Sequence, residues 1–170
     1  NEDINPLQAA RNGKLHPKVE DAMEMAQKLA KRDIPVIVSA WQLPQWATTE
    51  PKRYGLNEEG LRGNALDQSK MRSIIKSITS YLIYLKEAYG VEAEMFSFNE
   101  SDLGIYVRQT GEEHAELIKE LGEYMASKGL ATKMLLGDNS DANTYDFLTP
   151  AINDPATRKY IGAVSFHSWR

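Results

Sequence analysis

The fold of this chain is decided by one stretch, Ile34-Pro35-Val36-Ile37-Val38-Ser39-Ala40. The stretch is short, rich in β-branched residues and apolar on both faces, which is typical of a strand buried on both sides in a parallel sheet. Pro35 stands near the start of the stretch, where the missing N–H is tolerated. The sequence therefore predicts a strand over 34–40 with a mainly parallel sheet around it.

Helix and strand patterns alternate along the chain on either side of this strand. Amphipathic spacing predicts helices over 16–32, 67–89, 111–128 and 144–152, and apolar runs predict further strands over 93–98, 131–137 and 161–166. A long loop, 41–64, follows the first strand, and loops of that length are usually functional or disordered. Such alternation without repeats or linkers is typical of a doubly wound sheet or a (β/α)8 TIM barrel.

Composition narrows the possible partners. The 170 residues are 42% hydrophobic and 26% charged, as in a globular domain, and no apolar run reaches the roughly 20 residues that a membrane helix needs. The absence of such a run means that a membrane is not expected as a partner. A net charge of -4 gives no support for a phosphate-binding surface, so nucleic acid is not expected either. The chain has no Cys and only 3 His without ligand spacing, so neither a metal nor another cofactor is expected.

Polar and aromatic residues follow each predicted strand. These residues are Trp41 after the first strand, Asn99-Glu100 after the second, Asp138-Asn139 after the third and His167-Ser168-Trp169 after the fourth. Both parallel folds build their sites at the carboxyl ends of the strands, so these residues are expected to converge. Glycine-rich phosphate-binding motifs are absent after every strand, which favours the barrel.

The side chains at the strand ends are of the types that can bind and protonate a sugar substrate. An apolar environment favours the neutral form of a carboxyl such as Glu100, as a general acid requires, and Asn99 can bind a hydroxyl. Trp41 can stack on a sugar ring, whereas Trp46 is expected to pack in the core. Two alternatives stay open: Glu100 caps a helix or pairs with Arg108, and the Asn99 sequon carries a glycan.

Two further features of the sequence, one polar segment and two histidines, are given no catalytic role. The stretch 138–143 departs from the calcium-loop pattern, so it is interpreted as a polar rim with a helix cap, in which Asp138 and Asn139 are well placed to face a ligand. His114 is expected on a helix surface without a partner, and His16 at a helix end; neither is assigned any chemistry.

The ordered set of strand ends resembles a known group of enzymes. The segments Ser39-Ala40-Trp41-Gln42-Leu43-Pro44-Gln45-Trp46, Phe96-Ser97-Phe98-Asn99-Glu100, Leu135-Leu136-Gly137-Asp138-Asn139 and Val164-Ser165-Phe166-His167-Ser168-Trp169 resemble strands three to six of clan A glycoside hydrolases. Within the clan the chain is most similar to family 30, whose third strand carries a Ser-Pro-Trp-Ser-Pro-Pro-Ala-Trp type segment.

The resemblance implies a (β/α)8 barrel that hydrolyses β-linked poly- or oligosaccharides with retention. It implies that Glu100 is the general acid/base and that Asn99 binds the hydroxyl next to the reacting carbon. Trp41 and His167 would line the sugar subsite, with Trp169 as a neighbour. The nucleophile would be a Glu after strand seven, outside this segment. The resemblance further implies a secreted or periplasmic enzyme.

A complete barrel needs at least about 200 residues. Residues 1–170 are therefore expected to be a partial catalytic barrel domain of about four βα units, lacking strands one, two, seven and eight and inactive alone. Two alternatives remain: a non-catalytic carbohydrate-binding barrel, and an unrelated doubly wound α/β domain that is complete at this length. The sequence predicts no oligomeric state.

Overall fold

The computed structural model describes residues 5–49, 51, 55–58 and 60–168. Its main sheet has four strands in the order β1-β3-β5-β6, and every neighbouring pair is parallel. The strands are β1 (Ile37–Ala40), β3 (Met95–Phe98), β5 (Lys133–Asn139) and β6 (Ile161–Phe166). The predicted α/β class with a parallel sheet is therefore confirmed.

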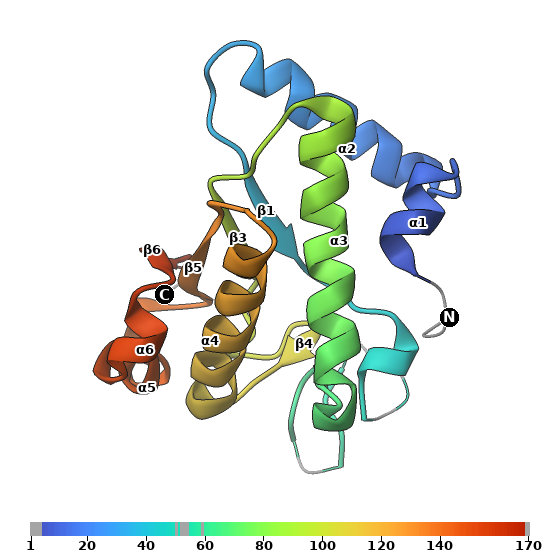
Figure 1. Ribbon diagram of the computed structural model, residues 1–170. Coiled ribbons are helices and arrows are strands. Elements are labelled where there is room, and N and C mark those ends of the chain that lie inside the picture. Colours follow the sequence, from blue (N-terminus) through green and yellow to red (C-terminus); the bar gives the residue numbers. More distant parts are fainter. Residues whose placement is uncertain (1–4, 50, 52–54, 59, 169–170) are drawn as a thin grey trace.

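Helices connect the strands in the predicted alternation. The helix α2 (Pro17–Ala30) precedes β1, α3 (Met71–Tyr89) leads from β1 to β3, and α4 (Gly111–Ser127) leads from β3 to β5. Figure 1 shows α3 and α4 side by side in front of the sheet. The connection from β5 to β6, expected as one helix, consists of the 3-10 segment η3 (Ala142–Leu148) and the short helices α5 (Thr149–Asn153) and α6 (Pro155–Arg158).

The order of the strands in space equals their order in the chain. Right-handed crossovers in one direction leave every connecting helix on the same face of a sheet, as in a barrel. A doubly wound sheet instead reverses its strand order at a switch point. No such reversal occurs among the described strands, which weighs against the doubly wound alternative.

Local sequence signals set the ends of the two long helices. The helix α4 opens with a capping box, in which the Thr110 hydroxyl accepts the Glu113 N–H and the Glu113 carboxylate accepts the Thr110 N–H. The helix α3 ends at Gly90, whose φ of 69° is the left-handed conformation that glycine adopts at little cost. The Asp67 carboxylate accepts the Ser69 N–H at η2 (Gln68–Lys70), just before α3.

The core lies between the sheet and the inner faces of α3 and α4. Phe96 and Phe98 of β3 lie with their ring centroids 5.4 Å apart and contribute to this core. Its fully buried members from the other elements include Ile74, Leu82, Leu117, Ile118, Leu121, Met125, Met134 and Leu136. A smaller cluster joins α2 to α3 through Met23, Ala26, Leu85 and Val91.

The outer strands are more exposed than the sequence predicts. Ile37 of β1 is 48% exposed, and Val164 and Phe166 of β6 are 51% and 54% exposed. The expectation of a first strand buried on both faces is therefore wrong for this chain: Val38 and Ala40 pack against the core, and the opposite face of β1 is exposed. The inner strand β3 is buried on both faces, since Phe96, Ser97 and Phe98 are all inaccessible.

The loops beyond the strand ends are tied together by a second, two-stranded parallel sheet. It pairs β2 (Asn64–Ala65), from the long loop after β1, with β4 (Val107–Arg108), from the loop after β3. Gly63 and Gly104 allow the close approach, because a Cβ on Gly63 would lie 2.4 Å from the Gly104 carbonyl oxygen. The sequence did not predict this sheet, η1 (Gln45–Ala47) or the first helix, α1 (Pro6–Arg11).

None of the described helices has the length and hydropathy of a membrane-spanning segment.

Candidate active site

Two carboxylates meet at the carboxyl ends of neighbouring strands. Glu100 follows β3 and Asp138 lies near the end of β5, and they are 7% and 8% exposed. The backbone N–H of Glu100 donates to the carbonyl oxygen of Asp138 at 2.9 Å, which fixes the two turns to one another. The sequence prediction that these strand ends converge is borne out for both residues.

Both residues have strained backbones. Glu100 has a φ of 46° and Asp138 a φ of 50°, in the left-handed region that side chains other than glycine rarely adopt. Such conformations cost on the order of 1–3 kcal/mol each and cluster at functional sites. The strain at two adjacent carboxylates therefore supports a functional interpretation of this part of the sheet.

A histidine from the next strand bridges the carboxylates. The Nδ1 atom of His167 lies 3.2 Å from Oε1 of Glu100, and its Nε2 atom lies 3.2 Å from Oδ1 of Asp138. A neutral imidazole has one N–H and donates to one carboxylate, whereas the imidazolium donates to both. The ring is thus within hydrogen-bond distance of both buried acids.

Serines from three strands surround Asp138. Ser97 of β3 donates from its hydroxyl to Oδ2 of Asp138 at 2.9 Å and lies 2.8 Å from the hydroxyl of Ser39 on β1. The hydroxyls of Ser39 and Ser165 lie 3.4 and 3.5 Å from the same carboxylate. These contacts place Asp138 to orient the imidazole of His167, and its contact with a ligand stays a prediction.

Asn99 lies beside Glu100 in the chain and is 4% exposed. Its backbone N–H donates to the carbonyl oxygen of Ala40, which holds the β3 end against β1. Its side-chain Nδ2 is buried and has no hydrogen-bond partner among the described residues. An unsatisfied buried amide is costly, and a substrate oxygen would relieve that cost. The burial also argues against glycosylation at this sequon in the folded protein.

Aromatic residues form the rim above the carboxylates. Trp41 follows β1 and is 51% exposed, and its ring lies 6.1 Å from that of Tyr106, centroid to centroid. An exposed indole supported by a second ring presents a flat apolar face, as a sugar-binding platform requires. Trp46 is partly buried against the main core, which agrees with its expected packing role.

One predicted ligand-facing residue, Asn139, is held by hydrogen bonds within the protein. Asn139 is buried, and its Nδ2 donates to the carbonyl oxygen and the hydroxyl of Thr144 at 3.1 and 2.8 Å. Its side chain therefore holds η3 against the end of β5, while its carbonyl oxygen accepts the His167 N–H at 2.7 Å. Trp169 lies outside the described residues.

The site also includes residues that the sequence analysis did not recognise. His114 was expected on a helix surface without a partner, but it is fully buried and contacts both Gln109 and Gly137. Burial lowers the pKa of His114 to about 4, although the nearby Asp102 carboxylate opposes this shift. The position could have been found from its spacing, because residues 114, 117, 118, 121 and 125 form one stripe on α4.

Asp102 is the acceptor for the loop that follows β5. Its carboxylate accepts the Ser140 N–H, the Ser140 hydroxyl and the Thr144 hydroxyl at 2.8–3.0 Å. This acid therefore organises the loop after β5 and connects it to the loop after β3. Within the described residues, no group of three or more acidic, His or Cys side chains has the arrangement of a metal site.

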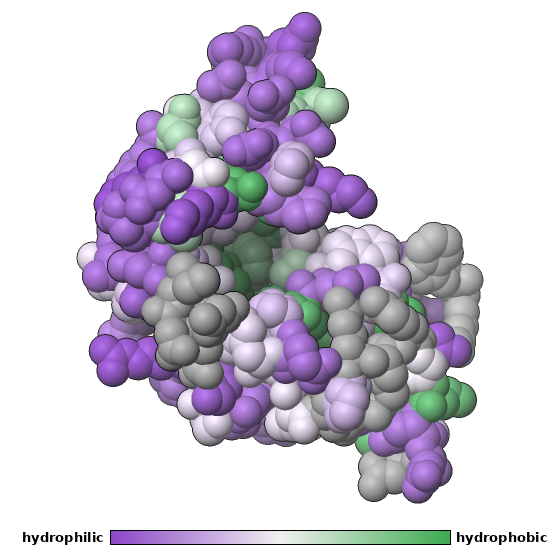
Figure 2. Space-filling view, turned by 90° about the vertical axis from the view of Figure 1, so that its right-hand side faces the viewer, coloured by the Kyte–Doolittle hydropathy of each residue, from purple (hydrophilic) through white to green (hydrophobic). Residues whose placement is uncertain are grey.

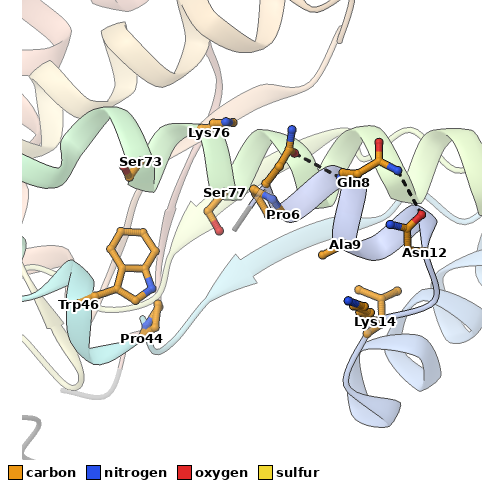
Figure 3. Close-up of a pocket in the computed structure, with 12 residues that line it drawn as sticks. Pro6, Gln8, Ala9, Asn12, Lys14, Pro44, Trp46, Ser73, Lys76 and Ser77 are labelled. Atoms are coloured by element: carbon orange, nitrogen blue, oxygen red, sulfur yellow. Dashed lines mark hydrogen bonds between the residues drawn. The ribbon is translucent and has the colours of Figure 1, made fainter. Parts of the chain in front are cut away.

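A hollow lies away from the carboxylates. Figure 2 shows a depression with apolar atoms at its floor on the side of the molecule where α1 lies. A groove of about 660 Å³ opens between α1, α3 and the η1 loop, and Figure 3 shows Trp46 and Pro44 on one side of it and α1, with Pro6 and Ala9, on the other. Neither Glu100 nor His167 lines this groove, so its size does not make it the candidate catalytic centre.

The fold was compared with those of known proteins. Neither models of known protein families nor curated protein sequences gave a match. Solved structures did match. An endo-β-1,6-glucanase is 20% identical over 92% of this chain, with a TM-score of 0.73. A family 30 subfamily 8 xylanase from Clostridium acetobutylicum is 20% identical over 88%, also at 0.73, and a family 30 endoxylanase from Clostridium papyrosolvens is 16% identical over 99%, at 0.74.

This chain spans only 37%, 37% and 41% of those three chains. The resemblance to family 30 of the clan A glycoside hydrolases that the strand ends predicted is thus confirmed for the fold.

Proposed function

We propose that this chain is part of the (β/α)8 barrel of a retaining β-glycosidase that hydrolyses an oligo- or polysaccharide. Residues 1–170 supply strands three to six, and the strands that close the barrel and carry the nucleophile belong to the rest of the enzyme. The one-directional strand order and the likeness to family 30 structures support this assignment. By the same analogy the enzyme acts outside the cytoplasm.

One observation carries the proposal: Glu100 is buried in a strained turn at the end of the inner strand, with its Oε1 atom 3.2 Å from Nδ1 of His167. Glu100 acts as general acid/base, giving its proton to the departing glycosidic oxygen and then activating water. The unsatisfied amide of Asn99 binds the neighbouring sugar hydroxyl, and Trp41 stacks on the ring. His167, held by Asp138, keeps the Glu100 carboxyl oriented towards the leaving oxygen.

The test is Glu100→Gln in the full-length protein, compared with Glu120→Gln on the exposed face of α4. Loss of general acid help should lower kcat/KM by about 10² to 10⁴-fold on a natural β-glycan. An aryl β-glycoside with a good leaving group should be cleaved with a much smaller loss in its first step, because its oxygen departs without a proton. The control variant should match the wild type on both substrates.

Equal losses on the two substrates would refute the role of Glu100. The alternative of a non-catalytic carbohydrate-binding barrel makes a different prediction, because Trp41 still offers a platform there. In that case the full-length protein would bind the glycan in calorimetry without hydrolysing it. The 170-residue chain alone is expected to be inactive, since retention needs two carboxyl groups about 5 to 5.5 Å apart and the second is supplied by strand seven.

A further inference from the structure

We propose that His114, on the outer helix α4, is a positioning residue that holds Glu100 and Asp138 in register with each other. This inference rests on the proposed function, and it concerns a residue that lies outside the cleft. His114 is fully buried, and its ring packs against Phe147 with centroids 4.9 Å apart. It is thus placed to act on the site through the backbone alone.

The hydrogen bonds of the ring define its tautomer. The backbone N–H of Gly137 can only donate, so Nε2 of His114, 3.2 Å away, must accept and carry no proton. The proton is then on Nδ1, which donates to Oε1 of Gln109 at 3.1 Å. Both nitrogens are satisfied only in this neutral form, which is consistent with the pKa of about 4 that burial imposes.

Each partner of the ring adjoins one of the carboxylates. Gly137 directly precedes Asp138, and the backbone N–H of Gln109 donates to the carbonyl oxygen of Ser101, which directly follows Glu100. Through these hydrogen bonds His114 connects the end of β5 to the loop after β3. The hydrogen bond from the Glu100 N–H to the Asp138 carbonyl oxygen connects the same two segments directly.

The β5 backbone is irregular at the point that His114 contacts. The pairing of β5 with β6 shifts between Gly137 and Asn139, which turns the Asp138 side chain towards the serines. Gly137 has a φ of 84°, and a Cβ there would lie 2.7 Å from Leu148 Cδ2 and 3.1 Å from the Ser165 carbonyl oxygen. Gly137 is thus closely packed in a conformation that favours glycine, and the hydrogen bond to His114 satisfies its buried N–H.

A substitution of His114 that removes the acceptor for the Gly137 N–H should displace the carboxylates without removing either of them. Asp138 would shift relative to Glu100, and His167 could no longer reach both acids at 3.2 Å. Misplacement of a catalytic group by about 1 Å can lower the rate by about 100-fold while substrate binding changes little. A purely structural role for His114 predicts lower stability with unchanged kcat.

Two variants of the full-length protein separate these roles. His114→Phe keeps a ring against Phe147 but has no acceptor for Gly137, whereas the Oε1 of Gln in His114→Gln can still accept that N–H. Leu85→Ala, in the separate α2–α3 cluster, serves as a destabilised control. kcat and KM are measured on a β-glycoside below the unfolding temperature of each variant. The ring ¹⁵N shifts of His167, assigned with His167→Ala, are followed against pH.

We expect His114→Phe to lower kcat by about tenfold or more with less than about a threefold change in KM, and to move the ring ¹⁵N resonances of His167. His114→Gln should recover most of both, and Leu85→Ala should affect neither. The proposal is overturned if His114→Phe leaves kcat and the His167 shifts unchanged, or if His114→Gln performs no better than His114→Phe.

If His114→Phe does not fold, His114→Asn takes its place, since the shorter amide reaches Gln109 but not Gly137. If the protein hydrolyses no glycoside, the proposed function fails, while the His167 shifts still decide whether His114 controls the distance between the acids.

Discussion

Acidification should destabilise this fold through a single buried imidazole. His114 is fully buried with its pKa lowered to about 4, whereas in the unfolded chain its pKa is near the ordinary 6.5. Between these values the unfolded state binds a proton that the folded state does not, so the free energy of unfolding falls as the pH falls. Each pH unit in this range costs about 1.4 kcal/mol, and lowering the pH from 7 to 5 should cost about 2 kcal/mol.

The window from pH 7 to 5 isolates His114 from the carboxylates. Hydrogen bonds from Lys86 and Ala131 lower the pKa of Glu92, and bonds from Thr157 and Ala156 lower that of Asp154. Protonation of these two carboxylates also lowers the free energy of unfolding, but only below about pH 5, where the carboxylates of the unfolded chain begin to take up protons.

Urea unfolding at pH 5, 6 and 7 measures the effect in the full-length protein and in His114→Gln. The Gln side chain does not titrate, and the other histidines are the same in both proteins, so the difference between the two pH dependences reports His114 alone. We expect the wild type to lose about 2 kcal/mol more than the variant over this range. Parallel pH dependences would refute the burial of a neutral imidazole at this position.

Three further changes test the packing and the rim. Gly122→Ala should destabilise the fold by about 1–3 kcal/mol in thermal unfolding, because the new Cβ would lie 2.4 Å from Tyr160 Cγ; a loss under 0.5 kcal/mol would show that the contact yields easily. Thr110→Ala should cost about 1 kcal/mol by removing the capping box with Glu113, and Thr110→Ser should retain it. Trp41→Ala should raise KM for the glycan while changing unfolding by less than about 1 kcal/mol, since the side chain is half exposed; an unchanged KM would remove Trp41 from the substrate platform.

Much of the fold could be read from periodicity. The helix predicted over 111–128 is observed at Gly111–Ser127, and the strand predicted over 161–166 is observed at Ile161–Phe166. Both elements have local signals, a capping box in one and a mainly apolar run with Ile161 and Val164 in the other. The segment 144–152 was less regular than predicted: Pro150 has no backbone N–H to donate, and the segment is divided between a 3-10 segment and a short helix.

The candidate site was only partly predictable. Glu100, Asp138 and His167 were predicted because parallel strands bring their carboxyl ends to one edge, a rule that needs no knowledge of side-chain positions. The direction of each side chain was beyond that rule. A register shift in β5 turns Asp138 towards the serines, and Asn139 towards Thr144.

The sequence by itself determined the elements, their order and the residues that stand at the strand ends, since each follows from local periodicity and from the geometry of parallel strands. Only the tertiary structure decided that His167 bridges two acids and that a buried His114 connects the turns that carry them. The physical reason is that these contacts join residues far apart in the chain, and their protonation depends on burial, which no local pattern encodes.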